Sequence, residues 1–146
     1  MSSKLKSRVQ SDLNEARKQR DRGRTLVLST LLAEIRNHEI DRGTEADDDA
    51  VVQVVTRAIK QRKDAAAQMR AAHRDELAAT EETQAEILGA YLPEGLTEEE
   101  VRGIVRELVA GGASQMGAVM GQLMPRIRGR FDGKEANRIV REELGG

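Results

Sequence analysis

An amphipathic helical pattern runs along almost the whole chain, and only two prolines, Pro93 and Pro125, interrupt it. From residue 5 onward, apolar residues recur at spacings of three and four, which places them on one face of a helix. Strong helix formers dominate the sequence, and β-branched residues are few outside one valine run in residues 51–55. That run lies inside a longer helical period, so no strand is expected there. The sequence therefore predicts an all-α fold.

Capping residues and glycines indicate where the helices begin and end. Gly43 is typical of a C-terminal stop, and the carboxylates of residues 47–49 suit a helix N-terminus. Four helices are expected before Pro93: from Ser2 or Ser3 to a break at 21–23, over about 24–40, from 47–49 through Met69, and over about 75–92. The apolar face expected for the fourth consists of Leu77, Ile87, Leu88 and Tyr91. Three more are expected after it: from Thr97 to 111–112, from Ser114 to Pro125, and from Asp132 through Leu144.

The segment YLPEGLTEEEV divides the chain into two expected domains. Pro93 cannot continue a helix, and Gly95 loosens the backbone that follows it. Thr97 and Glu100 then form the pattern of a capping box, which opens a new helix. We therefore predict an N-terminal helical bundle over residues 1–93 and a smaller C-terminal helical tail domain over residues 94–146.

Several classes of function lack their usual residues. The chain has no cysteine, which excludes disulfides and cysteine nucleophiles and is compatible with a cytoplasmic location. No phosphate-binding glycine loop or zinc-protease motif is present, and His38 and His73 lie in separate polar segments. The carboxylates of residues 47–49 point in different directions on a helix and do not predict a metal site. We expect no catalytic residue, cofactor, metal or membrane span.

The strongest functional signal is a basic elbow, residues 126–134, between the last two expected helices. If this stretch is extended or turn-like, its alternating arginines lie on one side, and its glycines allow close approach of a ligand. The free N–H groups of the following helix would add positive charge. Arginine suits phosphate geometry, so the pattern favours a clamp for a nucleic-acid backbone, with a solvated basic loop as the alternative. The predicted binding residues are Arg126, Arg128, Gly129, Arg130, Gly133, Lys134 and Arg138.

Of three further patterns, two permit two interpretations each. The residues Arg57, Lys60, Gln61 and Asp64 share a helical face that is either solvated or a second anion contact. The segment 17–24 is a further basic stretch, partly balanced by Glu15 and Asp21. Methionines 116, 120 and 124 form a stripe that suits core packing or a partner groove.

Four blocks of the chain resemble successive blocks of the YqeY-like proteins: LLAEIRNHEID, IKQRKDAA, EILGAYLPEGLTEEEV and GAVMGQLMPRIRGRFDGKEANRIV. The C-terminal part is also similar to the tail domain of the B subunit of the tRNA-dependent glutamine amidotransferase. That resemblance implies a two-part helical protein whose tail contacts tRNA through the elbow, with Asp132 and Asn137 as further matching positions. Phe131 stands where the family commonly has alanine.

The resemblance implies a non-catalytic accessory protein that binds tRNA or another structured RNA. The amidotransferase also needs an amidase subunit and a large catalytic portion, and neither has a counterpart in 146 residues. Homology to a carbon–nitrogen ligase that uses glutamine therefore does not by itself assign catalysis to this chain. The alternatives are a protein-interaction adaptor, with an aminoacylation or amidation enzyme as partner, and an accessory factor in tRNA amidation.

Overall fold

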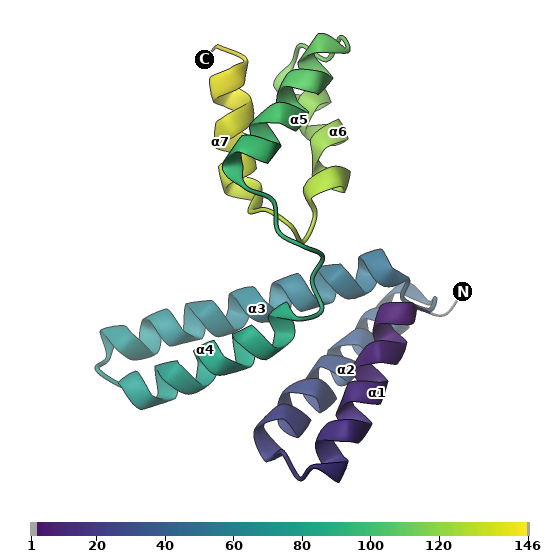
Figure 1. Ribbon diagram of the computed structural model, residues 1–146, viewed down its shortest axis with the longest axis vertical. Coiled ribbons are helices and arrows are strands. Elements are labelled where there is room, and N and C mark those ends of the chain that lie inside the picture. The colour runs from purple at the N-terminus through teal and green to yellow at the C-terminus, as the bar shows by residue number, and fades with distance from the viewer. Residues whose placement is uncertain (1–2, 146) are drawn as a thin grey trace. The chain divides into compact units, whose positions relative to one another are not determined.

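The computed structural model describes residues 3–145, and every regular element in that range is an α-helix, which confirms the all-α prediction. Figure 1 shows their arrangement. The helices are α1 (Lys4–Lys18), α2 (Arg22–Arg42), α3 (Asp48–Ala71), α4 (Asp75–Gly89), α5 (Glu98–Ala110), α6 (Met116–Ile127) and α7 (Gly133–Glu143).

The chain divides into two compact units, Met1–Leu92 and Pro93–Gly146, which we call the N-terminal and C-terminal units. This division falls one residue before the predicted boundary. The N-terminal unit contains α1 to α4, and the C-terminal unit contains α5 to α7. Each unit has a hydrophobic core of its own.

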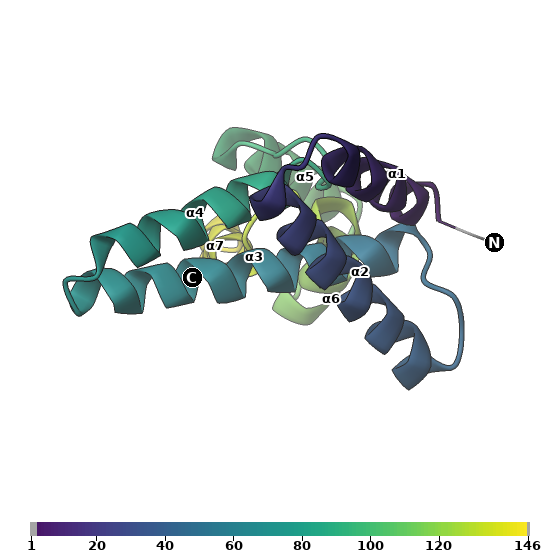
Figure 2. The ribbon, with the colours of Figure 1, turned by 90° about the horizontal axis from the view of Figure 1, so that it is seen from below.

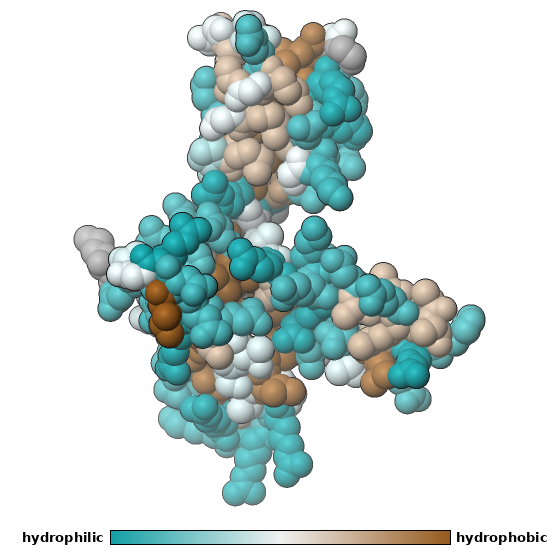
Figure 3. Space-filling view, turned by 180° about the vertical axis from the view of Figure 1, so that it is seen from behind, coloured by the Kyte–Doolittle hydropathy of each residue, from teal (hydrophilic) through white to brown (hydrophobic). Residues whose placement is uncertain are grey.

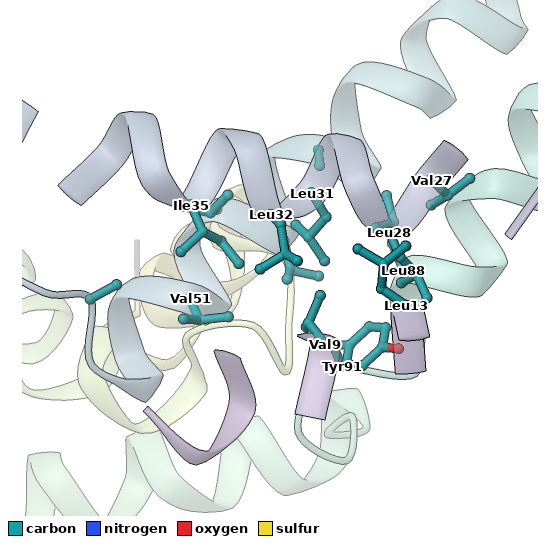
Figure 4. Close-up of a cluster of buried hydrophobic side chains, with 14 residues drawn as sticks. Val9, Leu13, Val27, Leu28, Leu31, Leu32, Ile35, Val51, Leu88 and Tyr91 are labelled. Atoms are coloured by element: carbon teal, nitrogen blue, oxygen red, sulfur yellow. The ribbon is translucent and has the colours of Figure 1, made fainter. Parts of the chain in front are cut away.

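The N-terminal unit consists of two helical hairpins, α1–α2 and α3–α4, and Figures 1 and 2 show the hairpins running in different directions. Large aliphatic side chains from α1, α2, α3 and the end of α4 meet in one core (Figure 4). Leu28 and Ile35 of α2 are fully buried in it, as are Val55 of α3 and Val9 of α1. The predicted apolar face of the fourth helix was wrong at Leu77, which is 49% exposed because it lies near the free end of the α3–α4 hairpin.

Polar contacts hold the ends of the N-terminal helices. The Ser3 side chain caps α1, and its hydroxyl donates to the carboxylate of Asp48, whose pKa is lowered by this bond. At the other end of the unit, the buried Tyr91 hydroxyl donates to Asp12 Oδ2 at 2.5 Å. Burial, followed by this bond to Asp12, raises the pKa of Tyr91 to about 12. The start of the unit is thereby tied to α3, and its last segment is tied to α1.

Local capping agrees with the predictions in some places and corrects them in others. The Thr97–Glu100 capping box and the left-handed Gly43 at the end of α2 are both present. Asp21 caps α2, so that helix begins at Arg22 and not at Arg24. The cap of α6 is Gln115, with no side-chain hydrogen bond, and not Ser114 as predicted.

The C-terminal unit packs three helices around aliphatic side chains. Val105 of α5, Leu123 of α6 and Ile139 of α7 are fully buried. Pro125 was expected at the end of the sixth helix, but α6 continues through Ile127. A proline near the end of a helix removes one backbone hydrogen bond, and the buried Ile127 keeps the last turn packed against the core.

Candidate nucleic-acid interface

The basic elbow is a tight connection between α6 and α7, and of the two backbone forms considered from the sequence, extended or turn-like, it adopts the turn. Arg126 lies in the last turn of α6, and Arg128 is the residue that ends that helix. The backbone N–H groups of Arg130 and Phe131 both donate to the carbonyl of Ile127, at 2.8 and 3.1 Å. The chain therefore turns immediately after α6, and the three arginines do not alternate along one side.

The Arg130 guanidinium is used within the fold. Its Nε donates to the backbone carbonyl of Glu94 at 2.9 Å, and the Leu96 N–H donates to the Arg130 carbonyl at 2.9 Å. These two bonds attach the elbow to the segment that precedes α5. Arg130 thus positions the elbow, with less of its donor capacity left for a ligand.

Gly129 and Gly133 of the elbow differ in whether the structure requires a glycine. Gly129 adopts a left-handed conformation with φ of 73°, which glycine enters without steric cost. Gly133 is the first residue of α7, and a Cβ atom added there would meet only the Met124 side chain, at an ordinary 3.7 Å. The conformation of the turn accounts for Gly129, and no steric requirement accounts for Gly133.

Arg138 is the centre of an ion-pair network on the surface of the C-terminal unit. Its guanidinium contacts the carboxylates of Glu98, Glu135 and Glu142, with distances of 2.8 Å to Glu135 and 2.6 Å to Glu142. Hydrogen bonds to these carboxylates, the bond to Glu135 first, raise the pKa of Arg138. Arg138 therefore connects α7 to the start of α5, and three carboxylates already neutralise the cation predicted for phosphate.

The remaining cations of the elbow are less engaged. Arg126 has one distant partner, the exposed Glu107 carboxylate at 3.7 Å. Arg128 and Lys134 are exposed, and no carboxylate of residues 3–145 lies within ion-pair distance of either. These two side chains are the ones that remain available to an anion.

The start of α7 contributes backbone donors beside these cations. The Asp132 side chain accepts from the N–H of Glu135 at 3.1 Å and caps the helix. The N–H groups of Gly133 and Lys134, by contrast, have no acceptor within the described part of the chain. Two free donors thus lie next to Lys134 at the positive end of the helix dipole, although the Asp132 carboxylate offsets part of that charge.

A comparison with known protein families decides what kind of chain this is. The family model described as Yqey-like protein matches residues 6–144. The chain belongs to the Yqey-like protein family. The resemblance seen in four blocks of the sequence is thereby confirmed over nearly the whole chain.

One relative of this Yqey-like chain is the Altered inheritance of mitochondria protein 41, mitochondrial, of Pyrenophora tritici-repentis (strain Pt-1C-BFP). The two sequences are 27% identical over 144 residues, which cover 94% of this chain and 80% of the relative. The relative is described as mitochondrial, whereas a cytoplasmic location for this chain stays a prediction.

The phenylalanine and three methionines of the C-terminal unit of this Yqey-like chain pack against its hydrophobic core. Phe131, the only phenylalanine, packs against the core of the C-terminal unit and is partly buried. Met116, Met120 and Met124 are partly buried in the same cluster, which favours core packing over a partner groove. Stacking of a nucleotide base on Phe131 would therefore compete with its packing against the core.

The second predicted cluster borders a polar cleft in the N-terminal unit. Arg57 and Gln61 of α3 line a space of about 270 Å³ together with His38 and Asp41 of α2. Because carboxylates also line this cleft, its charge does not favour the binding of an anion by itself. Within residues 3–145, no group of three or more side chains could hold a metal ion, and no helix is long and apolar enough to cross a membrane.

Sequence reasoning missed the partners of the elbow arginines. The contacts of Arg138 with Glu135 and Glu142 follow from spacings of three and four on one helix and could have been predicted. Its contact with Glu98 spans 40 residues and has no local signal. The bond from Arg130 to the Glu94 carbonyl also gives no signal in the sequence.

Proposed function

We propose that this Yqey-like chain is a non-catalytic accessory protein that binds the phosphate backbone of RNA, with tRNA as the preferred ligand, through the basic elbow. The observation that carries the proposal is the pair formed by Arg128 and Lys134. Both are exposed cations without a carboxylate partner among residues 3–145, and Lys134 lies in the first turn of α7, where two backbone N–H groups are free.

The elbow residues divide into two groups in this proposal. Arg128 and Lys134 contact phosphate directly, and Arg126 adds a third cation that is only weakly paired. Arg130 and Arg138 hold the elbow in shape through their bonds to Glu94 and to the glutamates of α5 and α7. Contacts of this kind position a protein on RNA and carry little information about base sequence.

The proposal assigns no chemical step to the chain. It has no cysteine, and its two histidines lie apart, His38 in α2 and His73 in the turn after α3. Similarity of the C-terminal unit to an amidotransferase tail supports a role beside an enzyme of tRNA amidation. Function belongs to sites and not to folds, so that similarity supports RNA contact before it supports catalysis.

The test is binding of labelled bulk tRNA, measured by fluorescence anisotropy across a salt series. The elbow variant Arg128→Gln/Lys134→Gln removes the two free cations and leaves the positioning residues intact. We expect log affinity to depend less steeply on log salt by about 1.4 to 1.8, the slope of roughly two phosphate contacts.

The matched control is Arg106→Gln/Arg141→Gln, which removes two positive charges from the same unit away from the elbow. Arg106 pairs with Glu143, and Arg141 bonds to Asn137. If the control and the elbow variant change the salt slope equally, general charge and not the elbow is responsible, and the proposal fails.

A protein-interaction adaptor is the second candidate, because residues 64–110 are acidic while both ends of the chain are mildly basic. Such a role predicts a protein partner that is retained from cell extract after ribonuclease treatment, with an aminoacylation or amidation enzyme as the expected class. Participation in amidation predicts that saturating amounts of the chain stimulate a reconstituted glutamine-dependent amidotransferase.

A further inference from the structure

The turn between α1 and α2 borders an open cleft of about 630 Å³ in the N-terminal unit. Three arginines, two hydroxyl residues and one leucine line it. We call it the hairpin cleft, and its residues are Arg17, Arg20, Arg22, Thr25, Leu26 and Ser29. Figure 3 shows hydrophilic side chains gathered at the lower end of this unit, where Figure 1 places the α1–α2 turn.

The cations at this turn have no carboxylate partners. No carboxylate of residues 3–145 lies within ion-pair distance of Arg17, Arg20 or Arg22, nor of the neighbouring Lys18. The nearby acidic groups are used elsewhere. Three of them make local contacts: Asp12 with Arg24 at 3.9 Å, Glu15 with Gln19 at 3.1 Å, and Asp21 with the N–H of Arg24 at 3.1 Å.

Arg20 adopts a backbone conformation that favours glycine. Its φ is 57°, and His73 is the only other non-glycine residue of the described range with a positive φ. A left-handed conformation costs an L-residue about 1 kcal/mol relative to glycine. The turn therefore carries a long cationic side chain at a position where glycine would be the less strained residue, and this side chain lines the cleft.

The lining combines charge with an exposed apolar surface. Leu26 is 59% exposed beside the three arginines. Guanidinium groups match phosphate oxygens in a bidentate manner, and an aliphatic side chain offers a surface for a ribose or a base. A ligand that alternates phosphates with less polar groups fits this lining, and an RNA strand has that chemistry.

The elbow alone offers few free cations. Arg128 and Lys134 account for about two phosphate contacts, whereas strong salt-dependent binding of nucleic acids involves roughly 6 to 10. The hairpin cleft supplies three arginines and the adjacent Lys18. Together with the elbow, these cations bring the number of free positive charges close to that range.

We infer that the hairpin cleft is a second RNA site, at which Arg17, Arg20 and Arg22 bind successive phosphates of the backbone. This inference rests on the proposed RNA-binding function and adds a site on the other unit of the chain. It predicts that the two sites contribute separately to the affinity for RNA, because their cations belong to different cores.

The experiment uses the full chain and labelled bulk tRNA across a salt series. The hairpin variant is Arg17→Gln/Arg20→Gln/Arg22→Gln, and its matched control is Arg36→Gln/Arg42→Gln/Lys63→Gln, which removes three exposed charges from the same unit. We expect the hairpin variant to lower affinity near 0.15 M salt by about 10- to 100-fold and to flatten the salt slope by roughly 2 to 3. The control should lower affinity by less than about threefold, since exposed charges outside the site are screened.

Two further measurements separate loss of charge from loss of structure and identify the occupant. An Arg→Lys version of the hairpin variant should keep most of the salt slope, and circular dichroism should show unchanged helix content in all variants. Polyglutamate of matched charge should compete with tRNA much less than an unlabelled RNA does. Equal competition by polyglutamate would overturn the RNA assignment in favour of an acidic protein partner.

The elbow variant in the same experiment distinguishes the two hypotheses. If the hairpin variant binds like its control while the elbow variant is weakened, the second site is refuted and the proposed function stands. The reverse result refutes the elbow and supports the cleft. Wild-type protein that does not bind tRNA above a matched DNA control refutes both.

Discussion

The two basic surfaces of this protein look alike in sequence and differ in what their arginines contact. In the elbow, Arg130 bonds to the Glu94 carbonyl, and in the adjoining helix α7 Arg138 contacts three glutamates. At the α1–α2 turn, Arg17, Arg20 and Arg22 line a cleft without a carboxylate partner among residues 3–145. The difference shows that a cluster of arginines indicates a binding site only when its charges are not already used inside the fold.

The difference has a physical cause in the composition of the two units. The C-terminal unit is small, and ion pairs join its helices α5 and α7. Arginines of α5 contact glutamates of α7, and Arg138 of α7 contacts Glu98 of α5. The hydrogen bond to Arg102 is the main cause that lowers the pKa of Glu142. The hydrogen bond to Arg106 is the main cause that lowers the pKa of Glu143. In the N-terminal unit, Arg24 pairs with Asp12 of α1, whereas Arg17, Arg20 and Arg22 make no ion pair between helices within residues 3–145.

The largest expected effect comes from removing the support beneath the elbow. Ile127 is fully buried at the end of α6, so Ile127→Ala should destabilise the C-terminal unit by about 2 to 5 kcal/mol. A unit of this size has little stability to spare, and we expect it to unfold first in urea. The elbow contribution to RNA binding should disappear, while a salt-dependent contribution of the hairpin cleft should remain.

Leu77→Ala provides the matched control for this change. Leu77 is 49% exposed and lies outside both the elbow and the hairpin cleft, so its truncation should leave the urea midpoint nearly unchanged. Circular dichroism and anisotropy on the same samples check both results. If Ile127→Ala loses all RNA binding at urea concentrations where the N-terminal unit stays helical, the proposed difference between the two surfaces is contradicted. The hairpin cleft would then bind no RNA by itself.

An intermediate effect is expected from Arg138→Ala. Removing this guanidinium leaves Glu98, Glu135 and Glu142 close together without their shared cation, so the C-terminal unit should melt at a lower temperature. Arg128→Ala, which removes a cation without partners in residues 3–145, should leave the melting temperature unchanged and weaken RNA binding more. Differential scanning calorimetry at low and high salt measures the first effect, which should shrink as salt increases. The opposite ranking of these two variants would show that Arg138 is a ligand contact and Arg128 a structural residue.

The smallest expected effect is at Arg20. Arg20→Gly relieves the left-handed conformation and should change stability by no more than about 1 kcal/mol, in the stabilising direction or near zero. Loss of one phosphate contact should lower RNA affinity by about threefold and reduce the salt slope by roughly 0.7 to 0.9. His73→Gly is the control, since it relieves the same conformation in the α3–α4 turn without removing a cation of the cleft. A clear loss of stability in Arg20→Gly would assign the Arg20 side chain to the fold.

The sequence by itself determined the helices and most of their ends, because these depend on residues only three or four positions apart. The capping box from Thr97 to Glu100, the glycine stop at Gly43 and the carboxylates that open α3 could all be predicted in this way. The family resemblance likewise needed only the order of sequence blocks and was confirmed over residues 6–144.

Only the tertiary structure decided which side chains are free. The partners of Arg138 and Arg130 include Glu98 and the Glu94 carbonyl, 40 and 36 residues away in the chain. Leu77 is exposed and Phe131 is partly buried because of which helices of their own unit pack against them. Charge and polarity are properties of a residue, but the partner that neutralises a charge comes from packing, and packing brings together residues that are distant in the sequence.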